Sequence, residues 1–139
     1  MQELPPQFWQ GVLAFQQGRF YECHDILEAL WIEAQEPDKT FLQGVLQIAV
    51  ACYHLTNCNW RGAVILLGEG IRRLSSYEPS YGQVDVEHFL NTSAHLLNLL
   101  QTSGADEVST IAAQIAPSTG STQTGPLVPI LRTWRELHP

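Results

Sequence analysis

The sequence predicts an all-α fold, a compact bundle of about five to six helices built from antiparallel helical hairpins. Apolar residues recur at the three- and four-residue spacing that places them on one face of an α-helix. Prolines and glycines fall between these segments, and no alternating strand pattern competes with them. We therefore expect a single helical domain over residues 1–139.

Four helices are predicted in the first part of the chain. They span about residues 6–17, 20–34, 39–56 and 60–76. Pro6 suits the first turn of the first helix and Gly18 suits its end. Asp38 and Asn59 are candidate N-caps of the third and fourth helices. The third helix is apolar around most of its circumference, which predicts a central position in the bundle.

The C-terminal part is predicted to be less regular. Residues 85–116 contain a helix capped by Asp85 and a weaker second helix. Residues 117–129 are rich in Ser, Thr, Gly, Gln and Pro, a composition typical of a flexible loop. Residues 130–139 are predicted to dock on the bundle, as a short helix over 130–138.

Composition narrows the classes of function. The formal net charge is −7 and no basic run exists, so we expect no nucleic-acid partner. No signal sequence or membrane-length apolar run is visible, and the three cysteines show no disulfide spacing, which predicts a cytoplasmic protein without a membrane partner. Charged residues make up only 15% of the chain, which predicts a covered surface in a homo-oligomer or with a protein partner.

Polar residues interrupt the apolar stripes of two neighbouring helices. His24 and Glu28 lie one helical turn apart on the second helix. Gln43, Gln47 and His54 share one side of the third helix. Polar groups among core residues need partners, because burying them unpaired costs about 1–3 kcal/mol each. We therefore expect His24, Glu28, Gln47 and His54 to converge between these two helices.

Three interpretations of this cluster stay open. It is structural if Glu28 and the glutamines satisfy half-buried histidines and fix helix packing. It binds a divalent metal if His24, Glu28 and His54 act as ligands together with a further donor. It performs acid/base catalysis if the same three residues carry protons.

A long motif in the first half of the chain resembles a known family. Its residues are Phe15-x-x-Gly18-x-Phe20-Tyr21-Glu22-x-His24-x-x-x-Glu28-x-x-Trp31, then Gln43-Gly44-x-x-Gln47-x-Ala49-x-x-x-Tyr53-His54, then Asn59-x-x-Gly62-Ala63. The motif resembles domain of unknown function 309 over about residues 8–76. This resemblance implies a small all-α prokaryotic protein with no established activity. It also implies signature positions at His24, Glu28, Trp31, Gln47, His54, Asn59 and Gly62, and Gln47, Trp31 and Asn59 are candidate ligand-binding residues.

The sequence therefore favours a helical interaction or scaffold module with a structural His/Glu/Gln cluster. Its repeat-like hairpins and the outward positions of Ile65 and Leu66 support this interpretation. The alternative is a metal-dependent or acid/base enzyme of hydrolase type that uses His24, Glu28 and His54. Neither the reaction nor the role of the 117–139 tail can be derived from the residues.

Overall fold

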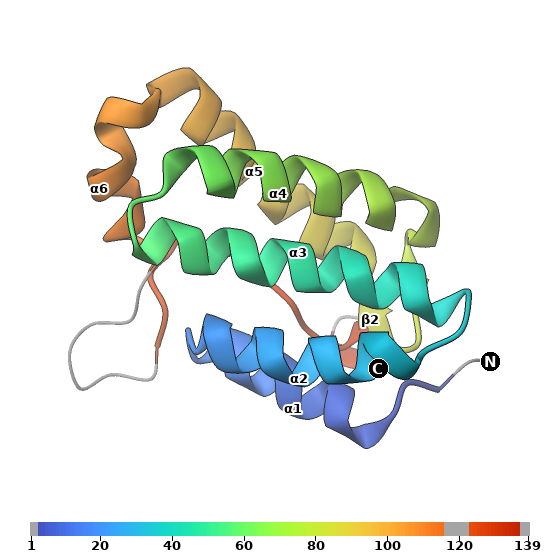
Figure 1. Cartoon of the computed structure of the whole chain (residues 1–139). Coiled ribbons are helices and arrows are strands. Elements are labelled where there is room, and N and C mark those ends of the chain that lie inside the picture. The colour runs from blue at the N-terminus through green and yellow to red at the C-terminus, as the bar shows by residue number, and fades with distance from the viewer. Residues whose placement is uncertain (1–2, 116–122, 137–139) are drawn as a thin grey trace.

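The computed structural model describes residues 3–115 and 123–136 of the chain. Six α-helices make up most of this part (Figure 1). They are α1 (Pro6–Gln16), α2 (Phe20–Glu33), α3 (Asp38–Thr56), α4 (Trp60–Leu74), α5 (Val86–Ser103) and α6 (Val108–Ala112). The predicted all-α bundle is confirmed, and the first four helices lie close to their predicted limits.

The helices α2, α3 and α4 form one layer, and α3 lies in the middle of it (Figure 1). Behind this layer, α1 packs against α2 and α5 packs against α4. Apolar residues from all sides of this arrangement are fully buried, including Phe8, Phe15, Phe41 and Phe89. None of the described helices is both long and apolar enough to cross a bilayer. The central position predicted for α3 is confirmed.

Glycines allow α3 and α4 to approach closely. A Cβ atom on Gly70 would lie 2.9 Å from the carbonyl oxygen of Gly44 and 2.7 Å from Cγ1 of Ile48. A side chain at Gly70 would therefore force the two helices apart. Gly70 lowers the helix propensity of α4, but it permits this close contact with α3.

A small antiparallel hairpin between α4 and α5 was not predicted. The 3₁₀ turn Ser75–Tyr77 leads to β1 (Ser80–Tyr81), which pairs with β2 (Val84–Asp85). Strands of two residues are too short to show an alternating pattern, so the sequence carries no signal for them. Asp85 then caps α5 as predicted, because its Oδ1 accepts a hydrogen bond from the backbone N–H of His88 at 3.1 Å.

The described part of the C-terminal segment packs on β2, and the helix predicted from residue 130 is wrong at its start. Residues 130–133 are extended, and Thr133 forms a β-bridge with Val84. The backbone N–H of Asp85 donates to the carbonyl of Arg132 at 3.1 Å, so pairing with β2 replaces helical bonds. Only the turn Trp134–Glu136 is helical among the described residues there. Residues 137–139 lie outside the described residues.

Two predictions for the preceding segment have mixed outcomes. The weaker helix is shorter than predicted, since α6 is preceded by the 3₁₀ turn Ala105–Glu107 and ends at Ala112. Residues 116–122 lie outside the described residues, and they include the first part of the predicted loop, residues 117–122. Its later part packs on the bundle, where the N–H of Leu127 donates to the carbonyl of Gln114 at 3.0 Å.

We call the side of the α2–α3–α4 layer that is turned away from α1 and α5 the outer face. Helical spacing places ten partly or fully exposed side chains on this face. They are Tyr21, Asp25, Glu28 and Ile32 of α2, Leu46, Val50 and Tyr53 of α3, and Arg61, Ile65 and Arg72 of α4.

Candidate functional site

His24 lies on α2 with a carboxylate at each ring nitrogen. Its Nε2 is 3.2 Å from Oε2 of Glu28, which is the pair that the sequence predicts. Its Nδ1 is 3.2 Å from Oδ1 of Asp25, a neighbour that the sequence analysis missed. Both ring nitrogens of His24 therefore face carboxylates of the same helix.

His54 is held by the cap of the next helix. The Oδ1 atom of Asn59 accepts a hydrogen bond from the backbone N–H of Gly62 at 3.0 Å, so the cap predicted at Asn59 is confirmed. The Nδ2 atom of Asn59 lies 3.1 Å from Nδ1 of His54. An amide nitrogen only donates, so Nδ1 is the acceptor, and neutral His54 carries its proton on Nε2.

The position of Gly62 is required by the same arrangement. A Cβ atom on Gly62 would lie 2.9 Å from Cδ2 of His54 and 2.7 Å from Nδ2 of Asn59. Only a residue without a side chain leaves room for both groups. The spacing of His54, Asn59 and Gly62 in the sequence is therefore explained by one compact helix junction.

Gln47 does not join the histidines, so the predicted four-residue convergence between α2 and α3 is wrong at this position. Its Nε2 donates to Oε2 of Glu69 at 2.9 Å, and its Oε1 accepts from Nη1 of Arg73 at 3.0 Å. Both partners belong to α4, so Gln47 lies on the α4 side of α3 while His24 and Glu28 lie on α2. Glu69 and Arg73 are partners that the sequence analysis missed.

The two histidines nevertheless reach one cavity between α2 and α3. The cavity has a volume of about 140 Å³ and is lined by Tyr21, His24, Val50, Tyr53 and His54. The ring centroids of Tyr21 and Tyr53 lie 5.2 Å apart in an edge-to-face arrangement. We call it the tyrosine cavity. Sequence reasoning missed both tyrosines, although Tyr21 and Tyr53 stand within one turn of the two histidines.

Trp31 lies near the C-terminal end of α2, away from the tyrosine cavity. Nζ of Lys39 lies 4.6 Å from the centroid of the indole ring and donates to the carbonyl of Trp31 at 2.8 Å. This cation therefore covers the ring and satisfies a carbonyl at the end of the helix. In the part of the chain that the structure describes, the buried indole Nε1 has no hydrogen-bond partner.

The predicted metal ligands are not assembled as a set. Among residues 3–115 and 123–136, no group of three or more His, Cys, Asp or Glu side chains is placed to hold one ion. Glu28 contacts His24, whereas His54 contacts Asn59. A divalent metal at His24, Glu28 and His54 therefore stays a prediction from the sequence, as do the ligand-binding roles of Gln47, Trp31 and Asn59.

The three cysteines differ sharply in environment. Cys23 and Cys52 are completely buried on facing sides of α2 and α3, and Cys58 is exposed in the turn after α3. Burial raises the pKa of the Cys23 thiol to about 12. Burial also raises the pKa of Cys52, and the neighbouring Cys23 adds to this effect. Both buried thiols are therefore neutral core groups.

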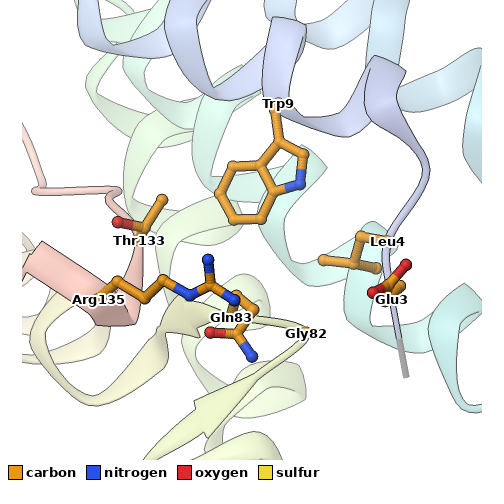
Figure 2. A pocket seen from close by; sticks show the side chains of 7 residues that line it. All are labelled: Glu3, Leu4, Trp9, Gly82, Gln83, Thr133 and Arg135. Atoms are coloured by element: carbon orange, nitrogen blue, oxygen red, sulfur yellow. The ribbon is translucent and has the colours of Figure 1, made fainter. Parts of the chain in front are cut away.

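A second cavity, of about 280 Å³, lies where the N-terminal segment, the hairpin turn and the C-terminal segment meet (Figure 2). The indole of Trp9 and the side chain of Arg135 extend into it from different segments, and Gly82 lies at its edge. Glu3 also lines this cavity, so its rim carries both signs of charge. None of the candidate residues predicted from the sequence belongs to it.

Comparisons with known proteins agree with the resemblance noted in the sequence. The family model of a domain of unknown function (DUF309) matches residues 8–66, which include every signature position. The chain is 33% identical over 95 residues to "Uncharacterized protein YpuF" of Bacillus subtilis (strain 168), which is 68% of this chain and 51% of that protein. The chain thus spans about half the length of this curated relative. No solved structure matches the chain.

Proposed function

We propose that this chain, whose residues 8–66 belong to the family of domain of unknown function 309, is a self-associating helical interaction module. Two copies meet through the outer face of the α2–α3–α4 layer. The observation that carries this proposal is the complementary character of the two edges of that face. The α2 edge is acidic, the α4 edge is basic, and exposed apolar side chains lie on both.

The outer face carries three large apolar side chains that are about half or more exposed. The exposed fractions are 56% for Tyr21, 62% for Ile32 and 47% for Ile65. Between them, Leu46 and Val50 of α3 are only partly buried. Burying such side chains contributes roughly 25 cal/mol for each Å² of apolar surface removed from water. A partner that covers α3 would therefore gain apolar contact along the whole layer.

The charges on the face favour a second copy as the partner. The outer face carries the acidic residues Asp25 and Glu28 on α2, and the arginines Arg61 and Arg72 on α4. A two-fold axis that runs along α3 places α2 of one copy on α4 of the other. Opposite charges then face each other twice, which favours this pairing and disfavours α2 on α2.

Gly68 gives independent support for close approach at this face. A glycine inside a helix costs about 1 kcal/mol relative to alanine. Nothing in the described chain lies within 4 Å of a Cβ atom built at Gly68, so no contact inside the molecule requires a glycine there. An approaching helix of a second copy would supply the missing reason.

The polar residues of the family motif fit a structural role in this proposal. His54 and Asn59 hold the junction of α3 and α4, and Gln47 joins the same two helices through Glu69 and Arg73. These bonds keep α3 and α4 at a fixed distance. They thereby shape the outer face without themselves contacting a partner.

The mass of the chain in solution tests this proposal. We expect sedimentation or light scattering to report a dimer that dissociates on dilution. Ile65→Asp is expected to shift the chain to the monomer, because it places a charge in the surface that the dimer buries. The matched control is Leu13→Asp on α1, where an apolar side chain is 49% exposed but lies away from the outer face. The monomer mass at every concentration, or equal effects of both variants, overturns the proposal.

The alternative, a metal-dependent or acid/base enzyme, rests on His24, Glu28 and His54 sharing one part of the fold. Its supporting observation is that both histidines line the tyrosine cavity. Elemental analysis of the chain beside its His24→Ala/His54→Ala variant separates the two functions. Near-stoichiometric metal in the unmodified chain, absent from the folded variant, would favour the enzyme.

A further inference from the structure

The tyrosine cavity is an incomplete packing site on the outer face. Its rings Tyr21 and Tyr53 form the walls, and Val50 contributes an aliphatic surface. The cavity opens to solvent on this face, since its lining residue Tyr21 is 56% exposed, so a side chain of a partner can enter it. A volume of about 140 Å³ is enough for one branched aliphatic side chain.

Ile65 lies level with the tyrosine cavity along the axis of α3, but on the α4 side of that helix. Gly62 of α4 lies against His54, and Glu69 of α4 bonds Gln47, so residue 65 is level with the middle of the stretch between them. Val50 lies in that stretch and lines the cavity. Ile65 and the tyrosine cavity are therefore level with each other along the axis of α3.

Resting on the self-association proposed above, we infer that Ile65 of each copy fills the tyrosine cavity of the other. A two-fold axis along α3 exchanges its two sides without changing height, so it carries Ile65 onto the partner's cavity. The same operation brings Arg72 toward Glu28 of the opposite copy. Each dimer therefore contains two identical contacts, in which Ile65 of one copy packs in the tyrosine cavity of the other beside flanking charges. We call this contact the socket.

Cysteine cross-linking tests this register. Ile65→Cys and Tyr21→Cys are combined in a Cys58→Ser chain, whose remaining cysteines are buried. Mild oxidation is expected to join residue 65 of one copy to residue 21 of the other. The control pairs Ile65→Cys with Ile32→Cys, which lies roughly 16 Å further along α2. We expect no bond in that chain.

The outcomes separate the socket from the proposed function. A dimer that forms the control bond, or neither bond, overturns the socket while self-association stands. A monomer of the unmodified chain at every concentration overturns both. Because the cysteine variants themselves could lose the dimer, the unmodified chain is also measured by isotope-filtered NMR of mixed labelled and unlabelled protein. Contacts between the Ile65 methyl groups and the tyrosine rings of the other copy support the socket, and their absence in a proven dimer overturns it.

Discussion

Gly62 and Gly68 both lie in α4, but only Gly62 has neighbours that exclude a side chain. A Cβ atom at Gly62 would meet His54 and Asn59, whereas one at Gly68 would meet nothing within 4 Å. We expect Gly62→Ala to lower the free energy of unfolding by about 1–2 kcal/mol, because the cap has to shift. Gly68→Ala is the matched control, and it is expected to raise this free energy by up to about 1 kcal/mol. Urea unfolding of dilute protein measures both. Equal effects would contradict the role assigned to Gly62.

The buried thiols of Cys23 and Cys52 predict a loss of stability at alkaline pH. An unfolded thiol titrates near pH 8.5, but burial raises the pKa of Cys23 to about 12 and also raises that of Cys52. Above about pH 8.5 the unfolded chain alone loses protons, so the free energy of unfolding falls by about 1.4 kcal/mol per pH unit for each thiol. Below that pH, the contribution of these thiols is fully present.

Urea unfolding between about pH 8 and pH 9.5 measures this slope before the tyrosines titrate. Cys52→Ala is expected to reduce the slope by about half, whatever its effect on absolute stability. Cys58→Ala is the control, because the thiol of Cys58 is exposed and its removal should leave the slope unchanged. A slope that is flat in the unmodified chain would contradict the prediction.

At the scale of elements, the helices and the central place of α3 were predictable, but the rotation of each helix about its own axis was not. Apolar periodicity, Gly18, Asn59 and Asp85 marked helix limits correctly, because these signals are local. The turns between the helices decide which side of α3 faces α2 and which side faces α4. No local sequence pattern specifies this. Gln47 therefore faces α4 rather than α2, and its partners on α4 could not be named beforehand.

A buried ion pair joins the C-terminal segment to β2, in addition to the backbone pairing between them. The carboxylate of Asp85 is 2% exposed, and its Oδ2 lies 3.3 Å from Nε of Arg132. We expect Arg132→Ala to lower the free energy of unfolding by about 2–3 kcal/mol, because it leaves this carboxylate without its cation. The control is Arg135→Ala three residues later, at an exposed side chain, with an expected change within about 0.5 kcal/mol. Thermal or urea unfolding checks both variants, and similar losses would show that Arg132 has no special role.

At the scale of the whole molecule, the low content of charged residues and the exposed apolar side chains of the outer face are both expected of a surface that a partner covers. The composition predicted that some surface would be covered, but it gave no location. The location depends on three helices that lie side by side, with acidic residues gathered on α2 and arginines on α4. The three helices lie side by side in one layer (Figure 1). The acidic residues of α2 and the arginines of α4 therefore belong to opposite edges of that layer.

The proposed dimer should therefore respond to ionic strength and to exchange of charges. Raising the salt from about 0.1 M to 1 M is expected to weaken it, because the Debye length falls from about 10 Å to 3 Å. Glu28→Arg and Arg72→Glu are each expected to weaken it by about tenfold, since each places like charges opposite one another. The double variant restores the pairing with its signs reversed, so we expect its dissociation constant to return toward that of the unmodified chain. Sedimentation measures all four chains after circular dichroism has shown that each is folded. If the dimer of the double variant is weakened by the sum of the two single effects, these charges do not face each other across the two-fold axis.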